Sequence, residues 1–391
     1  MTGAHSNALF ACCIREPEPI SYHPGSTMDS RSAPAVGKCR PRLYPGMTKR
    51  WGKPCLIQAG RPKADAKFAM TAGGFRASML LESGPGRNDS VLDYPSPHSA
   101  CPQETHLDPI AYVNGTFVPL SEAKISILDR GFLFADGIYE VSAVLDGKLI
   151  DNDSHLARLQ RSVGEISLQL PETLDRITEI QKDLIARNQL ANGLVYLEVT
   201  RGTHTGRDFA FPKGVKPTLV MFTSVKDIVN APTARTGIAV ITVPDIRWAR
   251  RDIKSVALLA QVLAKQAAAE AGAGEAWMIE DGKVTEGGSS SAFILTQDDV
   301  IVTRQNGSEI LPGCTRKAVV ALAAERQLRI EERPFSIEEA LAAKEAFITS
   351  ASSFVQAVTS IDGKPIADGK PGSMTNRLRE IYVDFARATS V

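Results

Sequence analysis

Hydrophobic and polar positions follow a regular pattern only after Pro109. Beyond that point, short alternating runs are joined by two-residue turns of the Asn-Gly or Asp-Gly type, the strongest short-range signal for a β-hairpin. The turns stand at Asn114-Gly115, Asp146-Gly147 and Asp281-Gly282. Other apolar runs have the length of strands and predict further ones. These runs occupy 194–202, 218–225, 238–243, 292–296, 300–303 and 345–350.

Apolar residues at helical spacing predict four helices between these strands. The helices occupy 155–166, 172–188, 255–272 and 314–327. Either Asp153 or Ser154 can cap the first helix through its side-chain oxygen. Pro171 is expected to open the second helix, and Gly272 is expected to end the third.

The order of these elements indicates the fold class. Hairpins alternate with helices, which is typical of an α+β protein and not of a doubly wound parallel sheet. Segment 227–237 contains no strong pattern and is the expected connection between two domains. The sequence therefore predicts a small α+β domain at 108–229 and a larger α+β domain at 230–391.

Residues 1–107 differ from the rest in composition. They hold 12 of the 23 prolines and 10 of the 30 glycines, without a sustained helical or strand period. Such a stretch has too little patterned apolar surface to offset chain entropy, so we expect a disordered N-terminal extension. Two alternatives stay open: an organelle-targeting segment, or translation from one of four internal methionines. These are Met28, Met47, Met70 and Met79.

Charge and cysteine content narrow the function classes. The formal net charge is +1, which argues against a nucleic-acid partner. Five of the six cysteines lie irregularly within 1–107, without a CxxC pair or a histidine cluster, so neither a metal site nor a disulfide framework is expected. No apolar run is long enough to span a membrane. The cytoplasm is the simplest compartment for such a chain.

Lys254 is the first candidate for chemistry, because it ends an extended run just before the third helix. A lysine that forms an imine must lose its proton near neutral pH. We interpret the neighbouring Arg250 and Arg251, with the apolar residues that follow, as a setting that favours the neutral amine. The alternative is an ordinary solvated lysine.

Two later segments complement this lysine. In Glu286-Gly-Gly-Ser-Ser-Ser, small residues would let the backbone approach a planar ring, and the carboxylate could keep a pyridine nitrogen protonated. Gly313-Cys314-Thr315 opens a helix, where free N–H groups suit a phosphate dianion, and Arg158 could add a cation. Taken singly, these are a hairpin loop, an N-cap and a surface arginine. Together with Lys254 they indicate pyridoxal 5'-phosphate (PLP).

In order and spacing, eight segments of this chain resemble the class IV PLP-dependent aminotransferases, most closely those that act on D-amino acids such as D-alanine. The resemblance runs from about Asp108 to the C-terminus and leaves 1–107 unmatched. The segments are AYVNGTFVPLSEAKISILDRGFLFADGIYEV, HLARL, VTRG, RDFAFP, DIRWARRDIKS, VTEGGSSS, LPGCTR and FITSAS. The resemblance implies a two-domain fold whose larger domain binds the cofactor, and a homodimer that transfers amino groups from D-amino acids to a 2-oxo acid such as 2-oxoglutarate or pyruvate.

The resemblance also implies residue roles. Lys254 would hold the cofactor as an imine and carry the proton, and Glu286 would pair with the pyridine nitrogen. The remaining cofactor contacts would come from Arg158, Ser289, Ser290, Leu311, Cys314, Thr315 and Ser352. Tyr139 would border the substrate, and Arg207 of the partner subunit would reach across to its carboxylate.

One position departs from the family pattern. Relatives that use D-alanine carry arginine, any residue, then histidine, whereas this chain has Arg207-Asp208-Phe209. Phe209 cannot donate a hydrogen bond, so part of the carboxylate site is lost or replaced, and His204 or Thr205 could substitute. The same scaffold leaves other activities open: a branched-chain L-amino acid or amine transaminase, an aminodeoxychorismate lyase, or a PLP-binding protein without catalysis.

Overall fold

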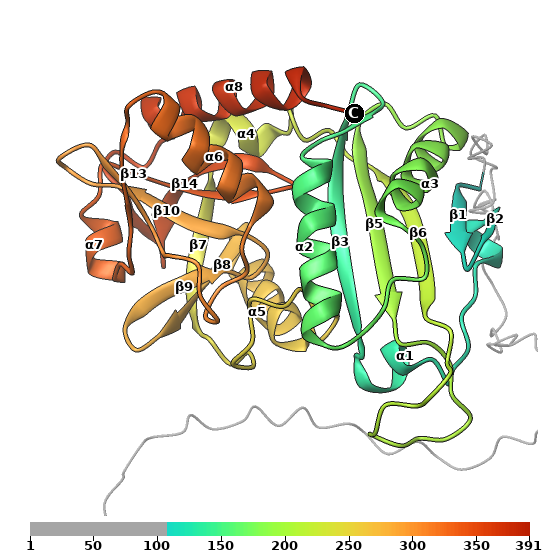
Figure 1. Ribbon diagram of the computed structural model, residues 1–391. Coiled ribbons are helices and arrows are strands. Elements are labelled where there is room, and N and C mark those ends of the chain that lie inside the picture. The colour runs from blue at the N-terminus through green and yellow to red at the C-terminus, as the bar shows by residue number, and fades with distance from the viewer. Residues whose placement is uncertain (1–107) are drawn as a thin grey trace, which may run out of the picture. The chain divides into compact units, whose positions relative to one another are not determined.

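The structure is a computed structural model that describes residues 108–391. The predictions for residues 1–107 lie outside the described residues. The strands form two sheets, with helices packed against them (Figure 1). The mixture of hairpins, helices and a partly parallel sheet confirms the predicted α+β class.

The first sheet is antiparallel throughout, in the order β2-β1-β6-β5-β3-β4. Its strands are β1 (Ile110–Val113), β2 (Thr116–Pro119), β3 (Gly137–Leu145), β4 (Lys148–Leu149), β5 (Gly193–Thr200) and β6 (Thr218–Val225). Alternate residues of β3, β5 and β6 pack against helices α2 (Asn152–Glu165) and α3 (Leu174–Arg187) in one apolar cluster. The other face of these strands carries half-buried side chains.

The second sheet has nine strands in the order β12-β11-β10-β13-β14-β7-β8-β9, with β15 beside β14. Its strands are β7 (Ile238–Pro244), β8 (Glu275–Glu280), β9 (Lys283–Gly287), β10 (Ser291–Leu295), β11 (Val300–Thr303), β12 (Arg329–Glu332), β13 (Glu345–Ser350), β14 (Phe354–Ile361) and β15 (Lys364–Pro365). Three pairs are parallel: β7 with β8, β7 with β14, and β11 with β12. The remaining helical elements are η1 (Leu120–Glu122), α1 (Arg130–Phe134), α4 (Pro232–Thr236), α5 (Leu259–Glu270), α6 (Cys314–Glu325), α7 (Ile337–Leu341) and α8 (Ser373–Ala388).

All three predicted hairpin turns are confirmed. Both central residues of each turn have positive φ, between 48° and 101°, as a turn matched to the strand twist requires. The turns are Asn114-Gly115, Asp146-Gly147 and Asp281-Gly282. Glycine at the second position and Asn or Asp at the first are the residues that reach this region at least cost.

The predicted starts of two helices were wrong. Helix α2 begins at Asn152 after Asp151, so neither Asp153 nor Ser154 caps it. Asp151 is held there by a long-range contact, a 2.6 Å hydrogen bond from the hydroxyl of Tyr382. Helix α3 begins at Leu174 and not near Pro171, because Thr173 Oγ1 accepts the N–H of Arg176 at 3.2 Å.

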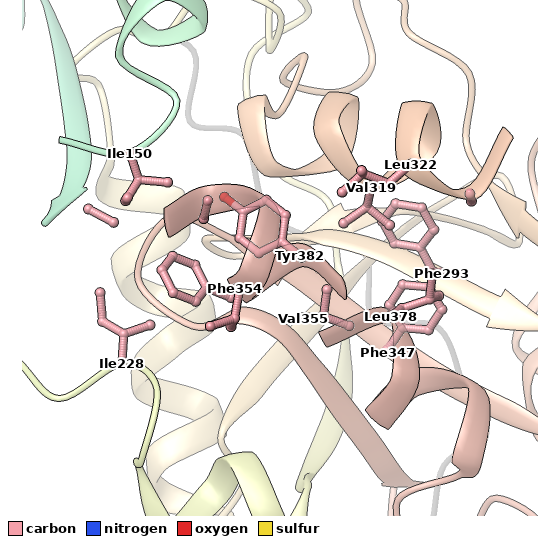
Figure 2. Packing of buried hydrophobic residues seen from close by; sticks show 14 of the residues in the cluster. Ile150, Ile228, Phe293, Val319, Leu322, Phe347, Phe354, Val355, Leu378 and Tyr382 are labelled. Carbon is pink, nitrogen blue, oxygen red and sulfur yellow. The ribbon is translucent and has the colours of Figure 1, made fainter. Parts of the chain in front are cut away.

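The largest apolar cluster contains residues from both halves of the described chain. Figure 2 shows Ile150, which follows β4, close to Tyr382 of α8 and Phe354 of β14. Phe293 of β10 and Phe347 of β13 stack in the same cluster, with ring centroids 4.7 Å apart. The two sheets therefore share a core, and the division at 229/230 into two domains stays a prediction.

We expect the replacement Phe347→Ala to lower the free energy of unfolding by about 3–5 kcal/mol, since it leaves a cavity beside a stacked ring. Urea denaturation followed by circular dichroism would measure the change. Val225→Ala is the control, because Val225 is 88% exposed and should change stability by less than about 0.5 kcal/mol. Equal effects of the two replacements would contradict the close packing of Phe347 in this cluster.

Candidate active site

The segment that contains Lys254 is hydrogen-bonded to the first sheet. The N–H of Tyr139 donates to the carbonyl of Lys254 at 3.0 Å, and the N–H of Val256 donates to the carbonyl of Gly137 at 3.1 Å. Ile138 and Ser255 form an antiparallel bridge between these bonds. Residues 254–256 thus extend the β3 edge of the sheet, and this pairing determines where the lysine side chain starts.

The amine of Lys254 lies beside an aromatic ring. Its Nζ is 4.2 Å from the ring centroid of Tyr139, and both residues line the same cavity. Carboxylates bind the two neighbouring arginines. Arg250 binds Asp252, and Arg251 binds Glu280 with both terminal nitrogens, at 2.7 and 2.6 Å. The charges of both guanidinium groups are thus balanced, and their expected effect on the lysine stays a prediction.

Glu286 lies near the end of β9 with only 4% of its surface exposed. Its Oε1 accepts a hydrogen bond from Arg247 at 2.5 Å and from the N–H of Leu311 at 3.0 Å. Its Oε2 has no hydrogen-bond partner within residues 108–391. Burial raises the pKa of the carboxyl, while Arg247 and the Leu311 amide oppose this shift. The group is a buried carboxylate with one oxygen left for a ligand in the cavity.

The start of α6 lies at the same cavity. Gly313 is the N-cap, and Cys314 and Thr315 are the first two helical residues, both buried. Ser352 approaches from the loop after β13, where Ser350 Oγ contacts the hydroxyls of Ser352 and Ser353 at 3.3 and 2.8 Å. The Thr349 hydroxyl, which also lines the cavity, is buried without a hydrogen-bond partner in the described part of the chain.

Arg158 is held by a carboxylate that the sequence analysis overlooked. Its Nε and Nη2 donate to the two oxygens of Glu140, at 2.8 and 2.7 Å, and its Nη1 donates to the carbonyl of Pro312 at 2.9 Å. His155, one helical turn earlier, contacts Glu140 Oε2 at 2.8 Å. The sequence did contain signals for this contact. Alternation along β3 turns Glu140 toward α2, and a spacing of three residues places His155 beside Arg158 on that helix.

These buried charged groups shift one another's pKa values. Burial opposes ionisation of Glu140, but Arg158 and His155 hold the pKa of its carboxyl well below the usual range. Burial alone would lower the pKa of His155, whereas the Cys314 thiol and Glu140 raise it to about 9. The cluster therefore brings a protonated histidine and an arginine to the first turn of α6.

Two glycines, Gly287 and Gly313, also line the cavity. A Cβ added at Gly287 would lie 2.2 Å from Ser290 Oγ, and one at Gly313 would lie 2.8 Å from Ser291 Oγ. Both are closer than real side chains approach, so any other residue would require the neighbouring serine hydroxyl to move. Four features together fit the ring, the nitrogen and the phosphate of PLP. They are the backbone at these glycines, the partnerless Thr349 hydroxyl, the free oxygen of Glu286 and the start of α6.

The other predicted site residues divide into two groups. Ser289 and Ser290 line the cavity, but their hydroxyls donate to the buried Glu275 at 2.9 and 3.0 Å, so only their backbone faces the cavity freely. Arg207 and Phe209 do not line it. Arg207 lies 5.2 Å from the ring of Phe134, on the loop between β5 and β6.

Arg130 shapes this loop. Its guanidinium donates to the carbonyls of Asp208 and Phe209, at 2.6 and 3.1 Å. Phe209 packs against Phe134 and is 75% exposed. The predicted reach of Arg207 into a partner subunit stays a prediction.

Within residues 108–391, no three side chains of His, Cys, Asp or Glu are grouped so as to hold a metal ion. Over the same residues, no helix is both long enough and apolar enough to cross a bilayer.

The raised pKa of His155 predicts a pH-dependent stability. A histidine whose folded pKa exceeds its unfolded value near 6.5 stabilises the fold fully below that value and loses this contribution as the pH rises toward 9. We therefore expect His155→Gln to destabilise the protein most at pH 6, by the order of 1–3 kcal/mol, and least at pH 9.5. Denaturant titrations at both pH values would measure this. His204→Gln, on the loop after β5, is the control; a pH-independent difference for His155→Gln would contradict the ion pair.

Comparison with known proteins agrees with this geometry. Residues 137–361 match the family of amino-transferase class IV. The chain is 37% identical over 281 residues to the D-alanine aminotransferase of Staphylococcus epidermidis, covering 72% of this chain and 99% of that protein. It is 40% identical over 268 residues to the D-alanine aminotransferase of Bacillus licheniformis, covering 68% and 93%.

Solved structures share the fold. The branched-chain amino acid aminotransferase of Escherichia coli has a TM-score of 0.66 at 21% identity, over 71% of this chain and 95% of that one. A hypothetical aminotransferase from Mycobacterium tuberculosis, solved in its PLP-bound form, has a TM-score of 0.62 at 20% identity, over 71% and 99%. At such identities the likeness concerns the fold alone. The family match and the relatives in sequence, together with the cavity around Lys254, show that this chain belongs to the class IV aminotransferases, which are PLP-dependent enzymes.

Proposed function

We propose that the protein transfers the amino group of a D-amino acid, with D-alanine as a donor, to a 2-oxo acid such as pyruvate or 2-oxoglutarate. The observation that carries this proposal is that Lys254, Glu286 and the start of α6 meet in one cavity. D-alanine as a donor is supported by the relatives named for that substrate, which match over nearly their whole length. The branched-chain enzyme of Escherichia coli is similar in fold and carries no argument for the substrate.

When bound, PLP supplies an aldehyde that takes up amino groups and a ring that accepts electrons. Glu286 would face the ring nitrogen, and Arg247 binds its other oxygen within a buried setting, where burial raises the pKa of the carboxyl and Arg247 opposes that shift. Thr315, the Cys314 backbone, Ser352 and Arg158 would hold the phosphate at the start of α6, where N–H groups and the helix dipole favour an anion.

Lys254 would carry the proton. Its Nζ would take the proton from the substrate Cα and return one during the second half of the reaction. Tyr139 covers one side of the amine at 4.2 Å and limits the directions in which Nζ can point. The backbone bonds between 137–139 and 254–256 keep the lysine and the tyrosine in register.

We also propose a homodimer in the cytoplasm. The support for a dimer is a group of exposed apolar side chains on and near α5, which solvent would normally disfavour. They are Leu259, Val262, Leu263, Ile246 and Trp248. Arg207 of the partner subunit would then bind the substrate carboxylate, and Phe209 would replace a hydrogen-bond donor with an apolar ring.

Replacing Lys254 tests the assignment of the base. Lys254→Ala should lower kcat by at least about 10³-fold, because both the covalent link to the cofactor and the proton carrier are removed. Pyruvate release from D-alanine with 2-oxoglutarate as acceptor would measure the rate. Lys182→Ala, on the exposed side of α3, should keep the wild-type rate. A rate for Lys254→Ala close to that of wild type would refute the assignment.

The choice of donor can be read from the visible absorption of the purified protein. We expect its cofactor band to change on addition of D-alanine and to stay unchanged with L-alanine. A response to L-leucine without one to D-alanine would favour a branched-chain activity. Pyruvate release from aminodeoxychorismate without an acceptor would favour a lyase, and a protein that stays colourless after soaking in PLP would exclude the catalytic proposal.

A further inference from the structure

Asp245 does not line the cavity itself, but its partner Arg247 does. Asp245 follows β7, and its N–H donates to the carbonyl of Ile279 on β8 at 2.9 Å, which ties it to the neighbouring strand. Its side chain is fully buried, and Oδ1 accepts the N–H of Arg247 at 3.1 Å. An aspartate that binds the backbone two residues later forms a local turn. This turn brings the side chains of Asp245 and Arg247 together.

The guanidinium of Arg247 is shared unequally between two carboxylates. Its Nε and Nη2 donate to the two oxygens of Asp245, at 3.0 and 2.7 Å, in the bidentate arrangement that is strongest for such a pair. Its Nη1 donates a single hydrogen bond to Glu286 Oε1, at 2.5 Å. The hydroxyl of Thr285 also donates to Asp245, at 2.7 Å. Asp245 is therefore the better compensated of the two acids.

The charges of this buried group do not cancel. Arg247 is the one cation between Asp245 and Glu286, and no second cation in the described part of the chain pairs with Glu286. Arg251 approaches Asp245 at 3.5 Å, but Glu280 already binds it at 2.6 Å. One negative charge is left over when all these acids are ionised, and burial makes an uncompensated charge costly.

The pKa shifts of the two acids show where this surplus falls. Burial raises the pKa of the Glu286 carboxyl, Arg247 opposes the shift, and the charge of Asp245 raises the pKa further. For Asp245, burial acts in the same direction, but the hydrogen bonds and the charge of Arg247 outweigh it and lower the pKa. Glu286 thus carries the surplus, and its free Oε2 fits a hydrogen-bond donor with a positive charge.

We infer that Asp245 is a positioning residue: by holding Arg247 and cancelling its charge, it leaves Glu286 a negative charge that selects a protonated ring nitrogen in the cofactor. The pairing of Glu286 with that nitrogen belongs to the proposed function, on which the inference rests; the new element is Asp245. Without Asp245, Arg247 would compensate Glu286 fully, and the carboxylate would have little preference for a cation. A protonated ring is the stronger electron acceptor, so the aspartate would tune the cofactor from outside the cavity.

The test measures the binding of two ligands to the full chain freed of its cofactor. One is PLP, and the other is its 1-deaza analogue, in which a C–H group replaces the ring nitrogen. Both ligands keep the aldehyde and the phosphate, so the ratio of their Kd values isolates the ring position. We expect wild type to bind PLP at least about tenfold more tightly, as one charge-assisted hydrogen bond implies. Asp245→Asn keeps the side-chain size, removes the charge and should reduce this preference to about threefold or less.

Thr285→Val is the matched control, because it removes a hydrogen bond to Asp245 from the same buried group without changing any charge. It should leave the ratio of the two Kd values unchanged, even if both ligands bind more weakly. A purely structural role of Asp245 would also weaken both ligands equally. That result for Asp245→Asn would overturn the inference.

A second variant keeps the test decisive if Asp245→Asn does not fold. The side chain of Glu280 is 37% exposed, so Glu280→Gln disturbs the core less, and it frees Arg251 to compensate Asp245. Arg247 can then give more of its charge to Glu286. The preference for PLP should fall by about threefold, because the change acts at a partly exposed pair. An unchanged preference in this variant would count against the inference.

The protonation of the ring nitrogen can also be observed directly. Nitrogen-15 NMR of the holoenzyme, loaded with PLP labelled at the ring nitrogen, should show a protonated nitrogen in wild type and a shift toward the unprotonated position in Asp245→Asn. An unprotonated nitrogen in wild type would refute the inference. Neither measurement depends on turnover. If both give the expected result but no D-amino acid is converted, the proposed function fails and the role of Asp245 stands.

Discussion

The backbone pairing between residues 137–139 and 254–256 is the contact on which the site depends. β5 pairs with β3 along its whole length, but β4 covers only Val144 and Leu145 on the other edge. The first residues of β3 would leave unpaired N–H and C=O groups at this edge. The lysine segment satisfies them, and Arg161 of α2 then binds both the carboxylate and the carbonyl of Asp252. The segment that carries Lys254 is thus bonded to a strand and a helix and is not a free loop.

Buried ion pairs stabilise both walls of the cavity around that amine. Glu140 with Arg158 and His155 belongs to the first sheet and its helix, and Glu286 with Arg247 belongs to the second. A buried charge is costly unless a partner and hydrogen bonds compensate it, so each carboxylate restricts its arginine to one orientation. The cavity therefore has its polar groups oriented before any ligand binds, which lowers the free energy that binding must spend on ordering them.

The fold was largely predictable because its signals are local. The turns, the strand runs and the glycine-rich segment can each be recognised within a few residues. Lys254, Glu286 and Gly313-Cys314-Thr315 line one cavity, while their roles stay predictions. Apart from the start of α3, which a local cap at Thr173 determines, the errors concern contacts between distant residues. Asp151, which precedes α2, accepts a hydrogen bond from Tyr382, and Glu275 binds the hydroxyls of Ser289 and Ser290. A single sequence does not show that Glu286 lies beside Arg247, 39 residues away, so this pair was missed.

The apolar cluster shared by the two sheets limits how the cavity can open. Ile150, Phe293 and Phe354 lie in one close-packed core, together with α8 (Figure 2). A hinge motion of one sheet against the other would have to separate these side chains and expose them to water, which close-packed interiors resist. Admission of the substrate therefore falls to small movements of side chains at the rim of the cavity. Rotation of one such side chain takes nanoseconds, so gating of this kind would be far faster than domain closure.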